Sequence, residues 1–279
     1  MQQHYLQYHW FGEHHTIGYR AFGDVHNRNV LLCVHGISRN ARDFDDIAEA
    51  LSDHYYVLAL DMPGRGESEW LEDKGHYGYP LYETVVGEVI EMLGARQVDW
   101  IGTSMGGVIG MRIAAMEHSP IRRMVLNDIG PFIPAAGRRQ NGASFGLDNR
   151  FASEADGISW IRENRTAFGP FTDAEWEKFG RDSLRKIGDG EWGLDYDPGL
   201  AETRATGDYN AWDQWAKIAC PVLCVWGLDS VLLTAETVER MQTTGPKAEV
   251  HRVAGAGHCP GLVNAKQIGA VRRFLVGGQ

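Results

Sequence analysis

One serine stands where the surrounding residues could make it a nucleophile. Ser104 lies in the pentapeptide GTSMG at residues 102–106, between an apolar run at residues 98–101 and a helical stretch at residues 105–116. A serine on a sharp turn between a strand and a helix is typical of a nucleophile elbow. The two glycines fit this interpretation, because side chains at these positions would collide with the neighbouring strand and helix.

A serine hydroxyl reacts only when a base removes its proton. His258 is the candidate base, because it lies in the glycine-rich stretch AGAGHCP at residues 254–260, directly after a predicted strand at residues 248–253. Such a loop lets an imidazole reach over the sheet edge toward Ser104 and act first as a base and then as an acid. Four other histidines belong to an N-terminal hairpin and are interpreted as solvated: His4, His9, His14 and His15.

The elements that would position these residues alternate along the chain. Two alternating stretches, 5–11 and 16–22, predict an antiparallel hairpin at a sheet edge. Short apolar strands are then predicted at 29–34, 55–60, 98–101, 123–127, 221–226 and 248–253, with helices at 41–51, 81–93, 105–116 and 265–276. This order predicts an α/β fold with a mostly parallel central sheet and helices on both faces.

The alternation breaks after Asp128. Residues 131–215 are rich in Trp, Phe and charged residues and contain no convincing buried strand. They also have too few aliphatic residues to form a core of their own. We therefore predict a core made of residues 1–130 and 216–279, with residues 131–215 inserted as a helical cap whose aromatic residues partly line a pocket.

Composition narrows the classes of partner. The chain has 279 residues, 43% of them hydrophobic, and a formal net charge of −10. That charge argues against a nucleic acid or an anionic membrane as partner, since both require a basic face. The apolar runs are too short for a membrane span, and the start MQQH lacks the pattern of a signal peptide. We expect a cytoplasmic protein with a small-molecule substrate, and a homo-oligomer stays open.

No cofactor or metal is expected. The four cysteines show no disulfide framework and are interpreted as reduced thiols: Cys33, Cys220, Cys224 and Cys259. The C-x3-C spacing of Cys220 and Cys224 occurs in some metal sites, but Pro221 and the strand-like sequence around it favour a buried strand. No dinucleotide fingerprint follows the first parallel strand, so no nicotinamide, flavin or nucleotide is implied.

Four motifs together resemble the α/β-hydrolases over nearly the whole chain apart from the predicted cap. They are the elbow at Ser104, HGI at residues 35–37, DMPGRGES at residues 61–68, and Gly257 followed by His258. The resemblance implies an oxyanion hole formed by the backbone N–H groups of Ile37 and Met105.

The chain departs from the family pattern at the third member of the triad. The resemblance places the acid three residues after Gly227, where the chain has Ser230. Asp229 lies one residue earlier, whereas Asp128 ends the preceding strand, from which many haloalkane dehalogenases take their acid. Asp128 is slightly favoured, although either carboxylate also fits a turn-stabilising role. The acid would fix the tautomer of the histidine and stabilise the imidazolium.

Three further residues are weaker candidates. Arg39 and Asn40, directly after the oxyanion turn, are placed to bind a substrate carboxylate at the pocket mouth, and a solvated loop is an equally good interpretation. Arg65 is interpreted as a structural ion-pair partner.

The predicted reaction is hydrolysis of a small-molecule ester or lactone through an acyl-enzyme on Ser104. Two alternatives stay open. One is hydrolysis of a carbon-carbon bond in a ring-cleavage product of aromatic degradation. The other is a non-catalytic ligand-binding homologue, for which the displaced acid is the only support.

Overall fold

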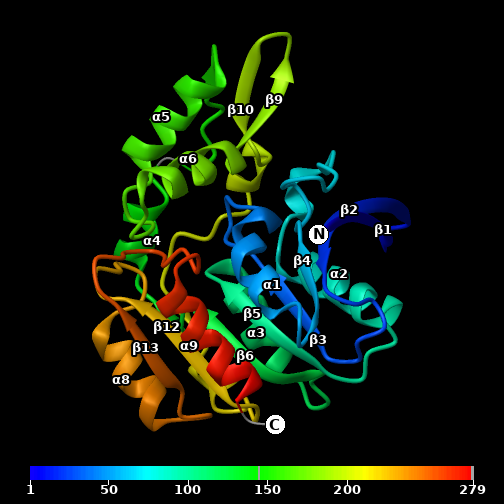
Figure 1. Cartoon of the computed structure of the whole chain (residues 1–279), viewed down its shortest axis with the longest axis vertical. Coiled ribbons are helices and arrows are strands. Elements are labelled where there is room, and N and C mark those ends of the chain that lie inside the picture. Colours follow the sequence, from blue (N-terminus) through cyan, green and yellow to red (C-terminus); the bar gives the residue numbers. More distant parts are fainter. Residues whose placement is uncertain (144, 278–279) are drawn as a thin grey trace.

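A mixed eight-stranded sheet forms the centre of the computed structural model, which describes residues 1–143 and 145–277 (Figure 1). Its strand order is β1-β2-β4-β3-β5-β6-β12-β13. The strands are β1 (Gln2–Trp10), β2 (Glu13–Phe22), β3 (Val30–Val34), β4 (Tyr56–Leu60), β5 (Val98–Thr103), β6 (Ile121–Asn127), β12 (Val222–Gly227) and β13 (Glu249–Val253). Strands β1 and β2 form an antiparallel hairpin, and β2 pairs with β4 in an antiparallel arrangement as well. All neighbouring strands from β4 to β13 are parallel. The predicted α/β fold and edge hairpin are confirmed.

Helices cover both faces of this sheet. A short 3-10 helix η1 (Ala41–Phe44), α1 (Asp45–Leu51) and α9 (Ala265–Val276) pack on one face. The other face carries α2 (Tyr79–Met92), α3 (Met105–Ala114) and α8 (Ala235–Thr243). Because both faces are covered, central strands such as β3 (VLLCV) are buried at every residue. Among the described residues, no helix is long and apolar enough to cross a membrane.

The parallel strands deliver the predicted site residues to one edge of the sheet. Ser104 follows β5, Asp128 follows β6, and the loop after β13 carries His258. The turn at residues 35–37 follows β3, which is the neighbour of β5. Since the carboxyl ends of parallel strands lie at the same edge, these four loops converge.

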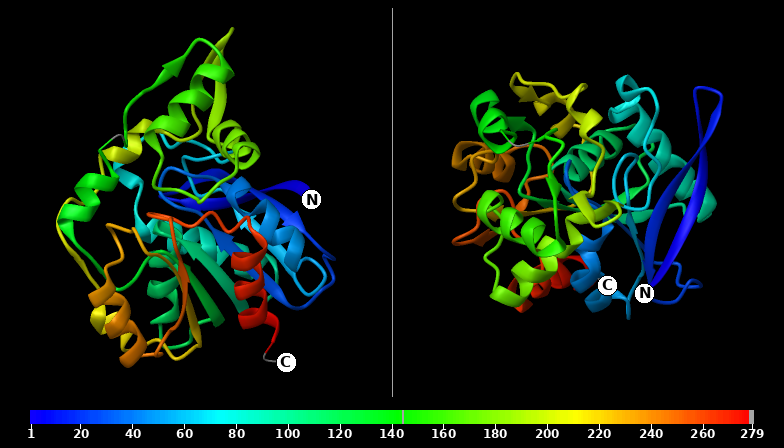
Figure 2. Two further views of the ribbon diagram at one scale, coloured as in Figure 1. Left: turned by 60° about the vertical axis from the view of Figure 1, so that its left-hand side comes forward. Right: turned by 90° about the horizontal axis from the view of Figure 1, so that it is seen from above.

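Residues 131–215, hereafter the inserted segment, form a separate layer over one end of the sheet (Figures 1 and 2). Its helices are α4 (Ala135–Asn141), α5 (Glu154–Asn164), α6 (Asp173–Asp182), η3 (Pro198–Ala201) and α7 (Trp212–Trp215). A further 3-10 helix, η2 (Lys74–His76), belongs to the core. The division into a core of residues 1–130 and 216–279 and a cap of residues 131–215 stays a prediction.

The sequence predicted a purely helical cap, but the inserted segment also contains strands. It contains a three-stranded sheet β8-β10-β9 (Arg150–Phe151, Glu191–Leu194, Leu184–Gly188) and a two-stranded pair β11-β7 (Tyr209–Asn210, Phe132–Ile133). These strands have two to five residues, and β9 (LRKIG) is mostly exposed. Such short strands lack the buried alternation by which a sequence reveals a strand.

Buried polar contacts hold the inserted segment against the core. The Asn40 amide donates to Asp195 Oδ2 at 2.7 Å and to the Asp182 carbonyl at 2.6 Å. Two residues further on, Asp197 accepts from the Tyr77 hydroxyl at 2.8 Å and from the Lys74 ammonium. Burial raises the pKa of Asp195, so this carboxylate depends on its donors.

We expect Asn40→Ala to lower the free energy of unfolding by about 1–3 kcal/mol, because it leaves the buried Asp195 carboxylate short of a donor. Urea unfolding measures this loss. Asn164→Ala is the matched control, since that exposed amide donates only to the nearby Trp160 carbonyl. Equal effects of the two changes would contradict the role given to Asn40.

Candidate active site

The turn between β5 and α3 holds Ser104 in a backbone conformation that residues other than glycine rarely adopt. Its φ and ψ are 51° and −110°, and its N–H donates to the Asn127 carbonyl at 3.1 Å. A Cβ at Gly102 would lie 2.4 Å from the Gly106 carbonyl oxygen, and one at Gly106 would lie 1.9 Å from the Val34 carbonyl oxygen. Both positions therefore require glycine, for the steric reason that the motif suggested.

A chain of hydrogen bonds links the three predicted side chains. His258 Nε2 lies 2.8 Å from Ser104 Oγ, and His258 Nδ1 lies 2.7 Å from Asp128 Oδ2. The imidazole and the carboxylate are almost inaccessible to solvent, with 4% and 0% of their side chains exposed. An ionised carboxylate only accepts, so Nδ1 carries the proton and Nε2 is free to accept the Ser104 proton.

Asp128, rather than Asp229, lies behind the imidazole. Asp128 Oδ1 accepts from the Gly227 N–H at 2.8 Å, and its Oδ2 accepts from the Ser230 hydroxyl at 2.6 Å as well as from His258. Asp229 is exposed, and its backbone N–H donates to the Ala256 carbonyl instead. Ser230 occupies the position where the family pattern has the acid. Its hydroxyl orients the Asp128 carboxylate, which serves as the acid instead.

Two backbone N–H groups face the cavity beside Ser104. Within residues 1–143 and 145–277, the N–H groups of Ile37 and Met105 donate to no protein acceptor, and both residues line the pocket that contains Ser104. Met105 is the first residue of α3, where an N–H has no partner within the helix. They are placed to donate hydrogen bonds to a negatively charged oxygen.

His35 fixes the turn that presents Ile37. Its Nδ1–H donates to the Gly36 carbonyl at 2.7 Å, and its Nε2 accepts from the Met62 N–H at 3.0 Å. Burial, together with the nearby Arg65 charge, lowers the pKa of His35 from 6.5 to about 3. The imidazole therefore stays neutral and keeps both bonds at physiological pH.

Arg65 is a positioning residue, and the interpretation as an ion-pair partner is wrong. Its fully buried guanidinium donates to the carbonyls of Ile37 (2.9 Å) and Pro63 (2.7 Å) and to the Tyr82 hydroxyl (2.9 Å). It forms no ion pair with a carboxylate in the described part of the chain. By binding the Ile37 carbonyl, it orients the peptide next to the predicted oxyanion donor.

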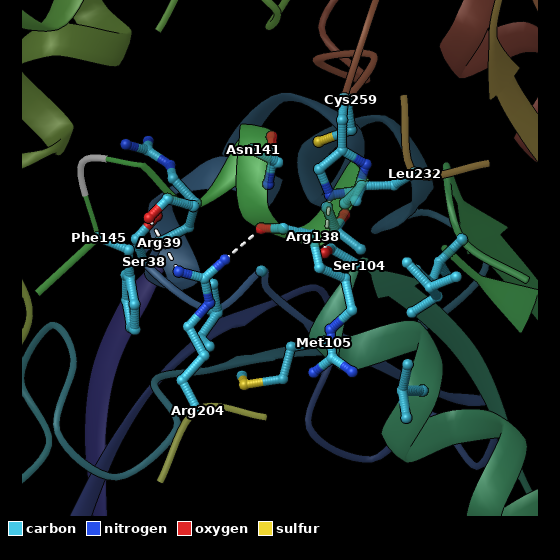
Figure 3. Close-up of a pocket in the computed structure, with 18 of the residues that line it drawn as sticks. Ser38, Arg39, Ser104, Met105, Arg138, Asn141, Phe145, Arg204, Leu232 and Cys259 are labelled. Atoms are coloured by element: carbon cyan, nitrogen blue, oxygen red, sulfur yellow. Dashed lines mark hydrogen bonds between the residues drawn. The ribbon is translucent and has the colours of Figure 1, made fainter. Parts of the chain in front are cut away.

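A cavity of about 120 Å³ opens beside Ser104 and is shown in Figure 3. Core residues line one part of it. The inserted segment contributes Ile133, Gly142 and Phe168 and, in addition, five residues that offer polar or aromatic contacts: Arg138, Asn141, Phe145, Arg165 and Arg204. Sequence reasoning missed these five, because nothing in their spacing relates them to Ser104. Only the fold of the inserted segment brings them to the pocket.

The side chains of the two predicted substrate-binding residues, Arg39 and Asn40, are bonded to other residues of the protein. Asn40 does not line the cavity, because its amide is used on Asp182 and Asp195. Arg39 lines it, but its guanidinium is already bound to the Asp43 carboxylate and the Ser183 hydroxyl and lies 3.8 Å from the centre of the Phe179 ring. The expected carboxylate site at Arg39 is therefore occupied by the protein's own Asp43.

The family model described as the alpha/beta hydrolase family matches residues 31–268. The chain belongs to this family. A 3-hydroxybutyrate-oligomer hydrolase of Cupriavidus necator is 38% identical to this α/β-hydrolase over 94% of each chain. An esterase of Mycobacterium tuberculosis is 27% identical over 82% of this chain and 76% of its own. A crystal structure of a Rickettsia typhi protein superimposes over all of both chains with a TM-score of 0.94 and 30% identity.

These likenesses confirm the resemblance that the four motifs suggested, and with it the prediction of an enzyme. Relatives named hydrolase or esterase cover most of the chain, which supports an ester hydrolase.

Asp128→Asn is expected to lower kcat by about ten-thousand-fold, as loss of the equivalent acid does in serine proteases, because the amide would favour the wrong imidazole tautomer. Asp229→Asn is the matched control and should leave kcat within about twofold, since surface changes away from a site have small effects. Steady-state hydrolysis of a chromogenic ester measures both. A larger loss in the Asp229 variant would reverse the assignment.

The buried His35 imidazole should make stability fall in acid. Below pH 6.5 the unfolded chain takes up a proton on His35, whereas the folded chain does not until about pH 3. His35 therefore favours the folded state fully above pH 6.5, and this contribution is lost as the pH falls toward 3. The free energy of unfolding of His35→Gln, measured in urea, should approach that of the unmodified protein between pH 7 and pH 4. A difference that stays constant with pH would contradict this.

Proposed function

We propose that this α/β-hydrolase cleaves carboxylic esters through an acyl-enzyme on Ser104. The observation that supports this most is the chain of hydrogen bonds from Asp128 through His258 to Ser104 Oγ. A hydroxyl held at 2.8 Å from an imidazole nitrogen that a carboxylate orients has the geometry of an activated nucleophile.

The proposed reaction proceeds in two halves. His258 Nε2 takes the Ser104 proton while Oγ attacks the ester carbonyl carbon, and the N–H groups of Ile37 and Met105 hold the resulting oxyanion. His258 then protonates the leaving alcohol, which departs and leaves an acyl group on Ser104. A water molecule, deprotonated by His258, attacks this acyl group, and the acid leaves as Ser104 regains its proton.

The inserted segment is proposed to act as a cap that selects the substrate. Its residues close the cavity over Ser104, and its buried contacts to Asn40, Lys74 and Tyr77 hold it in place. The name of the Cupriavidus necator relative suggests short esters of hydroxy acids as substrates, and we propose this class for the present chain.

A fluorophosphonate probe tests whether Ser104 is activated. We expect one phosphonyl group on the peptide containing Ser104, rapid labelling of the unmodified protein, and none at that peptide in Ser104→Ala. Ser38→Ala is the matched control. Ser38 lines the same cavity, but His258 Nε2 is bonded to Ser104, so this variant should still be labelled at Ser104.

Labelling of Ser104 no faster than of exposed hydroxyls would favour the non-catalytic alternative. If Ser104 is labelled, turnover of short hydroxy-acid esters, lactones and vinylogous diketones separates ester hydrolysis from carbon-carbon bond hydrolysis. Turnover confined to the diketones would overturn the proposed ester specificity.

A further inference from the structure

The cavity beside Ser104 is positively charged in a protein that is negative overall. The chain carries a formal charge of −10, yet four arginines and no aspartate or glutamate line this pocket. The arginines are Arg39, Arg138, Arg165 and Arg204. Arg39 is buried and the other three are partly buried. Since cations withdrawn from water are normally paired, the ones without a carboxylate partner call for an explanation.

Arg39 is accounted for by its ion pair with Asp43. None of the other three forms an ion pair with a carboxylate anywhere in residues 1–143 and 145–277. Arg138 donates to the Gly207 carbonyl at 2.9 Å, which fixes its guanidinium without neutralising it.

Arg204 is held in place by neutral groups. Its guanidinium donates to the Gly142 carbonyl at 2.8 Å and to the Arg138 carbonyl, and it lies 5.7 Å from the centre of the Phe145 ring (Figure 3). Burial, followed by the neighbouring Arg138 charge, lowers the pKa of Arg204. The group is thus oriented but its charge is uncompensated.

Arg165 is more deeply buried than Arg204. Burial lowers its pKa, and the nearby Arg39 charge adds to this, whereas its partner is the neutral phenol of Tyr196. That phenol also accepts from the Gly146 N–H, and its ring stacks on Phe145 with 5.3 Å between ring centres. Arg165 and Arg204 therefore flank one aromatic pair, Phe145 and Tyr196, of which Phe145 lines the cavity.

An anionic ligand would relieve both uncompensated charges. A guanidinium offers a planar set of donors that matches a carboxylate, and such charge-assisted bonds are stronger inside a pocket that excludes water. The ester carbonyl itself needs no cation, because the N–H groups beside Ser104 are available to it.

We propose that Arg165 and Arg204 form an anion subsite that binds a free carboxylate of the ester substrate. This rests on the proposed ester hydrolysis at Ser104 and adds a selection rule to it. The preferred substrates are esters that carry a carboxylate, such as a linear dimer of a hydroxy acid, rather than neutral esters of the same length.

A matched substrate pair tests the subsite. The linear dimer of 3-hydroxybutyrate and its terminal methyl ester differ only in the charge of the carboxyl group. We expect Arg204→Met and Arg165→Met each to lower the ratio of kcat/KM for the acid to that for the methyl ester by about tenfold to a hundredfold, mainly through KM. Arg139→Met, an exposed residue of the same helix as Arg138, should leave the ratio unchanged.

Two further arms separate the outcomes. Arg204→Lys keeps the charge and should restore part of the ratio, which a purely structural role would not predict. A second pair, p-nitrophenyl butyrate and mono-p-nitrophenyl succinate, carries the charge on the acyl side and shows on which side of the ester the carboxylate binds. The subsite would be overturned if the unmodified protein preferred the charged ester in neither pair. It would also be overturned if Arg165→Met and Arg204→Met lowered kcat/KM equally for charged and neutral esters.

Failure of the underlying reaction has a different signature. If Ser104→Ala still hydrolysed the neutral methyl ester at the full rate, the proposed function would fail irrespective of the arginines. If Ser104 were required but the ratio did not respond to Arg165 and Arg204, only the anion subsite would be wrong.

Discussion

The buried hydrogen bond between Asp128 and His258 is the interaction on which the rest of the site depends. It joins the loop after β6 to the loop after β13 across a distance of 130 residues in sequence and leaves the other imidazole nitrogen facing Ser104. A carboxylate without exposed surface is stable only if its oxygens are bound, and Gly227, Ser230 and His258 together supply those donors. The loop that carries Ser230 thus acts on the imidazole through Asp128.

The core of the site was predictable because its constraints are local. At Gly102 a side chain would collide with the first turn of α3, which follows from the strand-turn-helix connection alone, and at Gly106 it would collide with Val34 on the adjacent strand β3. The choice between Asp128 and Asp229 was not local. It depends on the path of the chain after β12, where Ser230 turns toward the carboxylate and Asp229 turns to solvent. The sequence therefore favoured Asp128 only slightly over Asp229.

The inserted segment was the least predictable part for the same reason. Its short strands carry no periodic pattern, and its three pocket arginines are separated by 27 and 39 residues in sequence (from 138 to 165 and from 165 to 204). The pocket arginines were missed, whereas Asn40 was wrongly predicted to bind substrate. A polar residue next to the oxyanion turn suggested substrate binding, yet its buried amide serves the contact with Asp195. Proximity in sequence to a catalytic motif did not distinguish a ligand contact from an internal one.

The most direct test of the account is rapid-quench trapping of the covalent intermediate during turnover of a p-nitrophenyl ester. We predict an acyl group on the peptide that contains Ser104, formed before steady state, and no such adduct in Ser104→Ala or His258→Ala. An acyl group attached to a different residue, or hydrolysis at the full rate by Ser104→Ala, would contradict it.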